Sequence, residues 1–288
     1  MPFVVRDSLS LPGSPERPNE DACGAAGDFA WAIDGAILPG TEPIMDAPSD
    51  AAWLVAFASE RFATLAPQAK DAARLVLSVV EEARALFLGR VEASGRAERM
   101  ERHTWPAAAL TLAHARPGAV ETLTLADTIA YVRDAAGSVY TLGEAPGLRR
   151  AESAHAERLL RETGLDIEAM RESPAYLADA ERRKRAQVAA APAIFGLHPD
   201  AVAQAERGSV ALDGTAQVLL ATDGFSALVE LYGAMDVAGL MERACSDGLA
   251  TLGGQLRTIE TEIDPTGRLY PRFKRSDDAT AILVEASF

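Results

Sequence analysis

β-Favouring apolar runs occur near both ends of this chain and in its middle, and helical blocks lie between them. The apolar runs include FAWAIDGAI, LTLADTIAYV, AQVLLATDG and ATAILVEAS. Helical blocks are predicted at 47–98, 151–188 and 225–261 from the spacing of apolar residues and from composition. Because sheets and helices bury their apolar faces against one another, this arrangement predicts one α+β domain over 1–288 whose sheets are covered by helices.

The middle of the chain carries three further patterns. β-Favouring runs separated by turn residues across 104–142 predict an antiparallel meander, with Asp127 inside an otherwise apolar strand. Pro174 predicts a break between two helices within 151–188. The basic run Arg182–Arg185 fits either a solvated helix face or a surface that holds an anionic substrate. The residues alone leave both interpretations of this run open.

Composition disfavours several classes of protein. With 28 basic and 42 acidic residues the formal charge is −14, which argues against nucleic acid and anionic membranes as partners. No apolar stretch approaches the roughly 20 residues that span a bilayer, and the N-terminus lacks the pattern of a signal peptide. Two cysteines, Cys23 and Cys245, are too few for a disulfide framework and fit a reducing compartment. We therefore expect a cytoplasmic protein.

Two of the apolar runs end in an aspartate followed by glycine, at Asp34 in FAWAIDGAI and at Asp223 in VLLATDGF. An ionised carboxylate is costly to desolvate unless it is paired, so strand-end aspartates either face water or meet a shared positive charge. Asp-Gly is also a common hairpin-turn signal, and Asp213-Gly214 is predicted to be such a turn. For Asp34 and Asp223 the residues alone leave the turn and the ligand interpretations open.

Further carboxylates lie next to β runs. Glu20 and Asp21 precede one run in NEDACG, and Asp277 and Asp278 precede the last in SDDATAIL. Each pair fits a solvated loop or turn, but several acids on separated strands make most sense if they converge. Mg²⁺ and Mn²⁺ take oxygen ligands and keep several waters, so a few carboxylates serve two ions. A glycine beside an aspartate lets an ion approach the backbone carbonyl closely.

Other chemistries are less well supported. The four histidines show no zinc-ligand spacing to one another or to a cysteine. The chain contains no Gly-x-Ser-x-Gly elbow, no Walker-type phosphate loop and no dinucleotide-binding glycine pattern after a strand. The carboxylate set is therefore the main candidate for a functional site.

The order of the motifs resembles that of a known family. NEDA, an apolar run ending in Asp-Gly, a mid-chain aspartate in a β region, LLATDGF and SDDATAILV resemble the metal-dependent Ser/Thr protein phosphatases, type 2C, and most closely a bacterial branch. The resemblance implies a four-layer αββα sandwich, with two antiparallel sheets flanked by helices and two Mg²⁺ or Mn²⁺ ions in a channel at one end. It also implies a helical flap-like insertion over about 151–200.

The resemblance assigns metal-binding roles to the N-terminal motifs. Asp34 would bridge the two ions, and the carbonyl oxygen of Gly35 would bind one of them. Glu20 would help to hold an ion, and Asp21 would hold its water shell.

The later motifs supply the remaining assignments. Asp223 and Asp277 would hold the second ion, and Asp127 matches the position linked to a weaker third metal. Arg17 is the nearest match to the family's phosphate-binding arginine, although its spacing to Glu20 is one residue short.

Three residues depart from the family pattern. Ala36 stands where animal members have a histidine proposed as general acid, so protonation of the leaving group would fall to water or another group. Ala126 replaces the usual glycine before Asp127, and Asp278 replaces a common asparagine, which adds a charge near the metals.

The resemblance implies Mg²⁺- or Mn²⁺-dependent hydrolysis of phosphoserine or phosphothreonine by a metal-bridging water, with Asp34 and Arg17 as catalytic residues and a phosphorylated protein as partner. A signalling role would follow. Two alternatives remain: a non-catalytic phosphatase-like adaptor, suggested by Ala36 and the spacing of Arg17, and a metal phosphatase for small phosphomolecules. The sequence does not indicate an oligomeric state.

Overall fold

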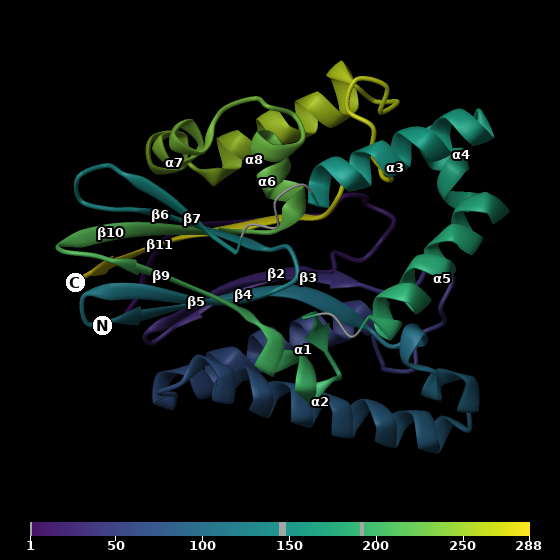
Figure 1. Ribbon diagram of the computed structural model, residues 1–288, viewed down its shortest axis with the longest axis horizontal. Helices are drawn as coiled ribbons and strands as arrows, with labels where there is room; N and C mark the ends of the chain where they lie inside the picture. Colours follow the sequence, from purple (N-terminus) through teal and green to yellow (C-terminus); the bar gives the residue numbers. More distant parts are fainter. Residues whose placement is uncertain (1, 144–147, 191–192) are drawn as a thin grey trace.

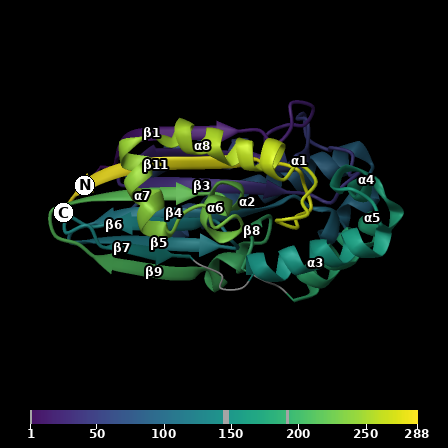
Figure 2. The ribbon, with the colours of Figure 1, turned by 90° about the horizontal axis from the view of Figure 1, so that it is seen from above.

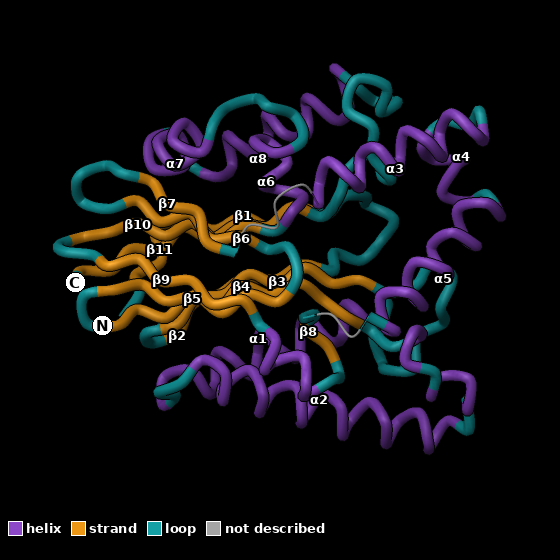
Figure 3. Tube along the Cα trace, in the orientation of Figure 1, coloured by secondary structure: helices purple, strands orange, loops and turns teal. Residues whose placement is uncertain are grey.

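Two antiparallel β-sheets pack face to face between two layers of helices in the structure of this protein, a computed structural model that describes residues 2–143, 148–190 and 193–288. Figure 1 shows the four layers edge-on, and Figure 3 distinguishes strands from helices by colour. Both chain ends lie at one end of the sandwich. The predicted α+β class and the four-layer arrangement are confirmed.

The first sheet has the strand order β1 (Val4–Leu11), β11 (Ala279–Ser287), β10 (Thr215–Ala221), β6 (Ile129–Arg133) and β7 (Val139–Leu142). The second sheet has the order β2 (Asp21–Ala26), β3 (Phe29–Ala36), β4 (Ala107–Arg116), β5 (Ala119–Leu125) and β9 (Glu206–Ala211), and the short β8 (Phe195–Gly196) pairs with β4. Strands from opposite ends of the chain thus lie side by side, because β11 pairs with both β1 and β10.

Helices cover the outer face of each sheet. The second sheet is covered by α1 (Asp50–Leu65) and α2 (Ala72–Ser94). The first is covered by α6 (Asp223–Glu230), α7 (Val237–Ser246) and α8 (Leu249–Thr258), which a π-helical turn at Ile259–Ile263 extends. Within the described part of the chain, no helix combines the length and apolar composition that crossing a bilayer requires.

The alternation of residues along β3 sets the position of the site. Its outward row, Phe29, Trp31 and Ile33, packs against α1 and α2. Ala30 and Ala32 face the other sheet. Because successive strand residues point to opposite faces, Asp34 continues the inward row at the end of the strand. Asp21 on β2 is its direct cross-strand neighbour. Two carboxylates therefore meet at one end of the layer between the sheets.

The segment 104–142 differs from the predicted single meander. β4 and β5 form a hairpin in the second sheet, whereas β6 and β7 form a hairpin in the first. The chain crosses between the sheets at residues 126–128, so Asp127 lies in a crossover and not inside a strand. Two strands joined by a short link and one long strand have the same apolar pattern, which is why periodicity did not separate them.

The middle of the chain folds into three helices, where two were predicted. They are α3 (Leu148–Thr163), α4 (Ile167–Glu172) and α5 (Pro174–Ala189), and we call them the helical insertion. Pro174 is the first residue of α5, a position that needs no backbone N–H, and Ser173 caps the helix by accepting a hydrogen bond from Tyr176 N. Figure 2 shows the insertion at the end of the sandwich opposite the termini. Residues 191 and 192, within the predicted insertion, lie outside the described residues.

Candidate active site

A cavity of about 320 Å³ lies between the ends of the two sheets and the helical insertion. Five of the predicted site residues line it: Asp34, Gly35, Asp127, Asp223 and Asp277. Asp21 lies opposite Asp34, and the carbonyl oxygen of Glu20 accepts a hydrogen bond from Gly35 N at 2.8 Å. The fold therefore brings seven of the eight predicted residues together from four separate segments of the chain.

Asp21 and Asp34 form the buried centre of this cluster. Burial is the main reason that both carboxyl groups have a pKa well above the usual range. At Asp34 the charge of Asp21 raises the pKa further. At Asp21 a hydrogen bond from Thr222 Oγ1 (2.8 Å) opposes the rise, and the charge of Asp277 adds to it. Carboxylates this close to one another need a positive countercharge in order to remain ionised.

One such countercharge comes from the helical insertion. Arg149 Nη2 lies 2.9 Å from Asp223 Oδ2 and also donates to the Asp223 carbonyl oxygen at 2.6 Å. Burial alone would raise the pKa of Asp223, but the charge of Arg149 lowers it below the ordinary value. Burial alone would likewise lower the pKa of Arg149, but Asp223 and Glu152 raise it. Asp223 opens α6, where the helix dipole also favours a negative charge.

A second countercharge is Lys274, which lines the cavity and forms an ion pair with Asp277 Oδ1. Burial would lower the pKa of Lys274, but the charges of Asp277 and Asp34 raise it well above the usual range. The Asp277 carbonyl oxygen accepts a hydrogen bond from Arg257 Nη2 (2.8 Å), which fixes the backbone just before β11. Lys274 therefore lies among the predicted metal ligands.

Glu20 and Asp278 order the loop before β2. Glu20 Oε1 accepts a hydrogen bond from Ser49 Oγ, the N-cap of α1. Burial raises the pKa of Glu20, although this hydrogen bond opposes the rise. Asp278 Oδ1 accepts from Gly13 N at 2.7 Å, and its Oδ2 accepts from Glu20 N at 2.8 Å. Asp278, the second carboxylate of the SDD motif, therefore stabilises the N-terminal loop by accepting hydrogen bonds from its backbone.

The two Asp-Gly pairs of the site are not turns. Asp34 and Gly35 lie within β3, and Asp223 and Gly224 form the first turn of α6. Both glycines are required by close contacts: a Cβ on Gly35 would lie 2.7 Å from the Glu20 carbonyl oxygen, and one on Gly224 would lie 1.9 Å from that of Asp278. The geometry excludes the hairpin interpretation for both.

The third pair lies away from the cavity. Asp213 is exposed in a link between β9 and β10, and Gly214 has a φ of +82° there. The prediction that this pair is a turn without a site role agrees with its position, although the turn joins the two sheets rather than two strands of one sheet.

Asp127 and its neighbour Ala126 line the cavity at the crossover. Burial raises the pKa of Asp127 to about 7, and the charge of Asp223 adds to the shift. Ala126 has a φ of +70°, a backbone conformation that glycine adopts without strain and alanine does not. The alanine that replaces the family's usual glycine at position 126 therefore strains the backbone locally.

Arg17 is the predicted residue that the fold does not bring to the cluster. It lies in an exposed turn before Glu20 and is not among the residues that line the cavity. Sequence reasoning missed Arg149 and Lys274, which do reach the carboxylates. Lys274 lies only three residues before Asp277, so its proximity in the sequence could have indicated a role. Arg149 lies 74 residues from Asp223 and carried no sequence signal.

The basic run of α5, Arg182–Arg185, also reaches the cavity. Arg183 and Lys184 line the cavity, and Arg183 pairs with the buried Asp179. The Arg183 guanidinium carbon lies 4.9 Å from the centroid of the Phe273 ring, which Tyr176 also contacts. Since Phe273 precedes Lys274, these contacts hold the helical insertion against the segment that leads to Asp277.

The residues present fit a divalent cation. Asp21 Oδ1 and Asp223 Oδ1 are buried and, with these two groups and Asp34 ionised, have no hydrogen-bond donor among the described residues. Such orphaned carboxylate oxygens match the hard oxygen ligands of Mg²⁺ and Mn²⁺. Among the described residues, no three Asp, Glu, His or Cys side chains converge closely enough to ligate one ion. The pairing of Asp223 with Arg149 and of Asp277 with Lys274 accounts for this, because each carboxylate is directed at a cation.

Comparison with known proteins identifies the fold. The catalytic domain of the serine/threonine phosphatase PstP in complex with two manganese ions aligns with a TM-score of 0.54 at 16% identity over 99% of both chains. PstP/Ppp from Mycobacterium tuberculosis aligns with a TM-score of 0.56 at 13% identity over 100% of both chains. PppA, described as a regulatory component of the type VI secretion system in Pseudomonas aeruginosa, gives 0.53 at 16% identity over 100% of this chain and 99% of that one.

No protein-family model matches the chain, and no curated protein matches its sequence. At identities this low the structural likeness shows a shared fold. The resemblance seen in the order of the sequence motifs is thereby confirmed as a resemblance of fold over the whole chain.

Proposed function

We propose that this chain, which has the fold of the bacterial Ser/Thr phosphatases, hydrolyses phosphoserine or phosphothreonine in proteins with the help of Mg²⁺ or Mn²⁺. The observation that carries the proposal is the cluster of Asp21, Asp34 and Asp223 beside the cavity, in which two buried carboxylate oxygens have no donor. Structural carboxylates seldom gather in this way without a counterion.

The metal ligands in this proposal are Glu20, Asp21, Asp34, the Gly35 carbonyl oxygen, Asp223 and Asp277, with Asp127 at a weaker third position. Two bound ions would supply a water of lowered pKa and would orient it for the reaction at phosphorus. A cation held by the Asp34 and Asp223 carboxylates would offset the repulsion within the cluster.

The chain's own cations bind the phosphate in this proposal. Arg149 and Lys274 both line the cavity and are the positive groups closest to the carboxylates. Charge-assisted hydrogen bonds from a guanidinium and an ammonium suit phosphate oxygens. We assign this role to them rather than to Arg17, because Arg17 lies outside the cavity. Ala36 supplies no acid, so the leaving oxygen would take its proton from water or from another group.

We further propose a cytoplasmic protein in which residues 1–288 act as one domain. Both cysteines are free thiols, which fits a reducing compartment, and strands from both ends of the chain share the first sheet.

The test is Mn²⁺-dependent release of phosphate from a phosphothreonine peptide. We expect activity from the wild type and only the background rate from Asp34→Ala. Asp213→Ala is the matched control, since it removes the exposed aspartate of the third Asp-Gly pair and should keep wild-type activity. Equal rates for wild type and Asp34→Ala would exclude the enzyme. Comparing phosphopeptides with free phosphometabolites distinguishes a protein phosphatase from one acting on small molecules.

A non-catalytic phosphoprotein adaptor is the second candidate. It is favoured by one observation: Arg149 and Lys274 already neutralise Asp223 and Asp277 without a metal. Calorimetric titration with Mn²⁺ separates the two functions. Tight binding supports the enzyme, whereas phosphopeptide binding without any measurable Mn²⁺ binding supports the adaptor.

A further inference from the structure

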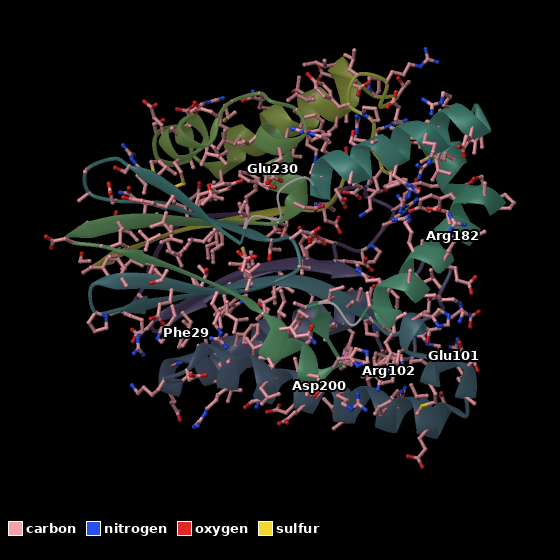
Figure 4. All side chains as sticks on the ribbon, in the orientation of Figure 1. Phe29, Glu101, Arg102, Arg182, Asp200 and Glu230 are labelled. Atoms are coloured by element: carbon pink, nitrogen blue, oxygen red, sulfur yellow. The ribbon has the colours of Figure 1, made fainter. Side chains whose placement is uncertain are left out.

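A second cavity, of about 120 Å³, lies directly beside the first. The two cavities share four lining residues, Ala107, Lys184, Gln187 and Ile194, so a chain that enters one can continue into the other. Trp105, Pro106 and Phe195 give the second cavity an apolar wall. Its charged lining groups are Lys184, Arg102 and Asp200. Figure 4 labels Arg102 and Asp200 near the C-terminal end of α5 and Arg182 further back along that helix.

Lys184 differs from the rest of the basic run on α5. Arg182 and Arg183 both pair with Asp179, and Arg185 pairs with Glu181 and Glu101. The Lys184 ammonium forms no hydrogen bond or ion pair with any described residue, although its side chain is largely buried between the two cavities. Burial lowers its pKa to about 8. The two interpretations therefore apply to different members of the run: three cations are paired, whereas Lys184 faces the cavities and has no partner among the described residues.

The other charges of the second cavity leave it net positive. Arg102 is exposed and forms no ion pair through its side chain with the described residues, whereas Asp200 supplies one negative charge. His198 stacks on Trp105 (5.0 Å between ring centroids), and burial, together with the charges of Arg102 and Arg84, lowers its pKa, so it is neutral near pH 7. Two cations in one cavity that have no ion-pair partner in the described part of the chain are unusual for a protein with a formal charge of −14.

We propose that the second cavity is a subsite for an acidic side chain that lies close in sequence to the phosphorylated residue of a substrate, with Lys184 as its counterion and Arg102 at the entrance. The inference rests on the proposed function in one respect: a phosphorylated residue has to occupy the first cavity. Side chains on one face of an extended peptide recur at every second residue, about 6.6 Å apart, so the side chains of residues two apart can reach adjoining cavities. The apolar wall packs against the methylene groups of the acidic side chain.

The test is the binding of short fluorescent peptides that carry a non-hydrolysable phosphonate analogue of phosphothreonine, measured by anisotropy with Mn²⁺ present. Paired peptides differ by Glu or Gln at one flanking position, so they differ in charge and not in size. We expect wild type to bind the Glu peptide about fivefold to tenfold more tightly at one or two of the positions. Lys184→Gln should remove this ratio, and Arg102→Gln should reduce it.

Arg185→Gln is the matched control, because it removes the neighbouring charge, which is already paired, and should keep the wild-type ratio. The proposal is overturned if wild type binds the Glu and Gln peptides equally at every position or binds neither, or if Lys184→Gln keeps the preference for Glu. Binding does not depend on turnover. A preserved Glu preference in a protein that releases no phosphate would therefore contradict the proposed enzyme and leave the subsite intact.

Discussion

The Arg149 guanidinium and the Asp223 carboxylate are paired at 2.9 Å, which joins the first turn of the helical insertion to the first turn of α6. The same guanidinium holds the Asp223 carbonyl oxygen and lies 3.3 Å from Glu152 on its own helix. A residue of the insertion thus competes for a carboxylate that we assign to a metal. The position of the insertion and the charge state of the site are therefore linked.

Replacing Arg149 should change metal and phosphate binding in opposite directions. Arg149→Gln removes the competing cation, so we expect Mn²⁺ to bind about fivefold to tenfold more tightly in a calorimetric titration. Phosphopeptide affinity should fall, because one phosphate-binding group is lost. Arg243→Gln is the control, since Arg243 pairs with Asp247 on α7. Weaker Mn²⁺ binding by Arg149→Gln would mean that the arginine orients Asp223 for the metal.

Gly224 should tolerate no side chain. Its Cβ would lie 1.9 Å from the Asp278 carbonyl oxygen, so Gly224→Ala has to displace α6 from the start of β11. We expect a loss of about 3 kcal/mol or more in the free energy of unfolding, measured by urea denaturation. Gly254→Ala makes the same change in α8, where nothing lies within 4 Å of the new Cβ, and should stabilise the protein by about 1 kcal/mol. Equal effects of the two substitutions would contradict the contact.

Ala126 should be improved by glycine. Its φ of +70° costs an alanine about 1 kcal/mol, so Ala126→Gly is expected to raise the free energy of unfolding by up to that amount. Ala63→Gly, at an exposed position inside α1, should lower it by about 1 kcal/mol. The same substitution thus has opposite signs at the two positions. Destabilisation by Ala126→Gly would show that the methyl group packs well enough to offset the strain.

The preference for acidic flanking residues should depend on pH. Burial lowers the pKa of Lys184 from 10.5 to about 8, so the ammonium is charged below that pH and neutral above it. The Glu-to-Gln affinity ratio should therefore be full near pH 7 and be lost as the pH rises through about 8.

Other charges around Lys184 do not supply this transition. The other charged groups are Arg102, Arg183 and Asp200, residue types that do not ordinarily titrate in this range of pH, and burial lowers the pKa of His198 away from it. A ratio that persists to about pH 10 would indicate an ordinary exposed lysine. The measurement is the same anisotropy assay, repeated across this range of pH.

The sequence predicted the layers of the fold and the acidic half of the site. Asp34 and Asp223 could be identified from the sequence because an acid followed by glycine at the end of an apolar run is unusual. Glycine is needed after each of them because Gly35 and Gly224 lie against the backbone of Glu20 and Asp278. The position of Asp127 was predicted wrongly, because an apolar pattern does not show where the chain leaves one sheet for the other.

The cationic half of the site was not predictable in the same way. Arg149 reaches Asp223 only because the insertion folds back over the end of the sandwich, and no spacing encodes that return. Arg17 was predicted to bind phosphate because it is close to Glu20 in the sequence, but it lies in an exposed turn outside the cavity. Lys184 belongs to a run of four basic residues. It differs from the other three in the structure, because those three form ion pairs.

The place of β11 between β1 and β10 has a consequence for the order of folding. A growing chain exposes β1 long before β11 exists, so the first sheet stays divided until β11 has left the ribosome. Asp278, which secures the loop that carries Glu20, arrives at the same late moment. A nascent chain that lacks β11 therefore has neither a closed sheet nor an assembled carboxylate cluster, and competence to bind metal should appear only after β11 has been synthesised.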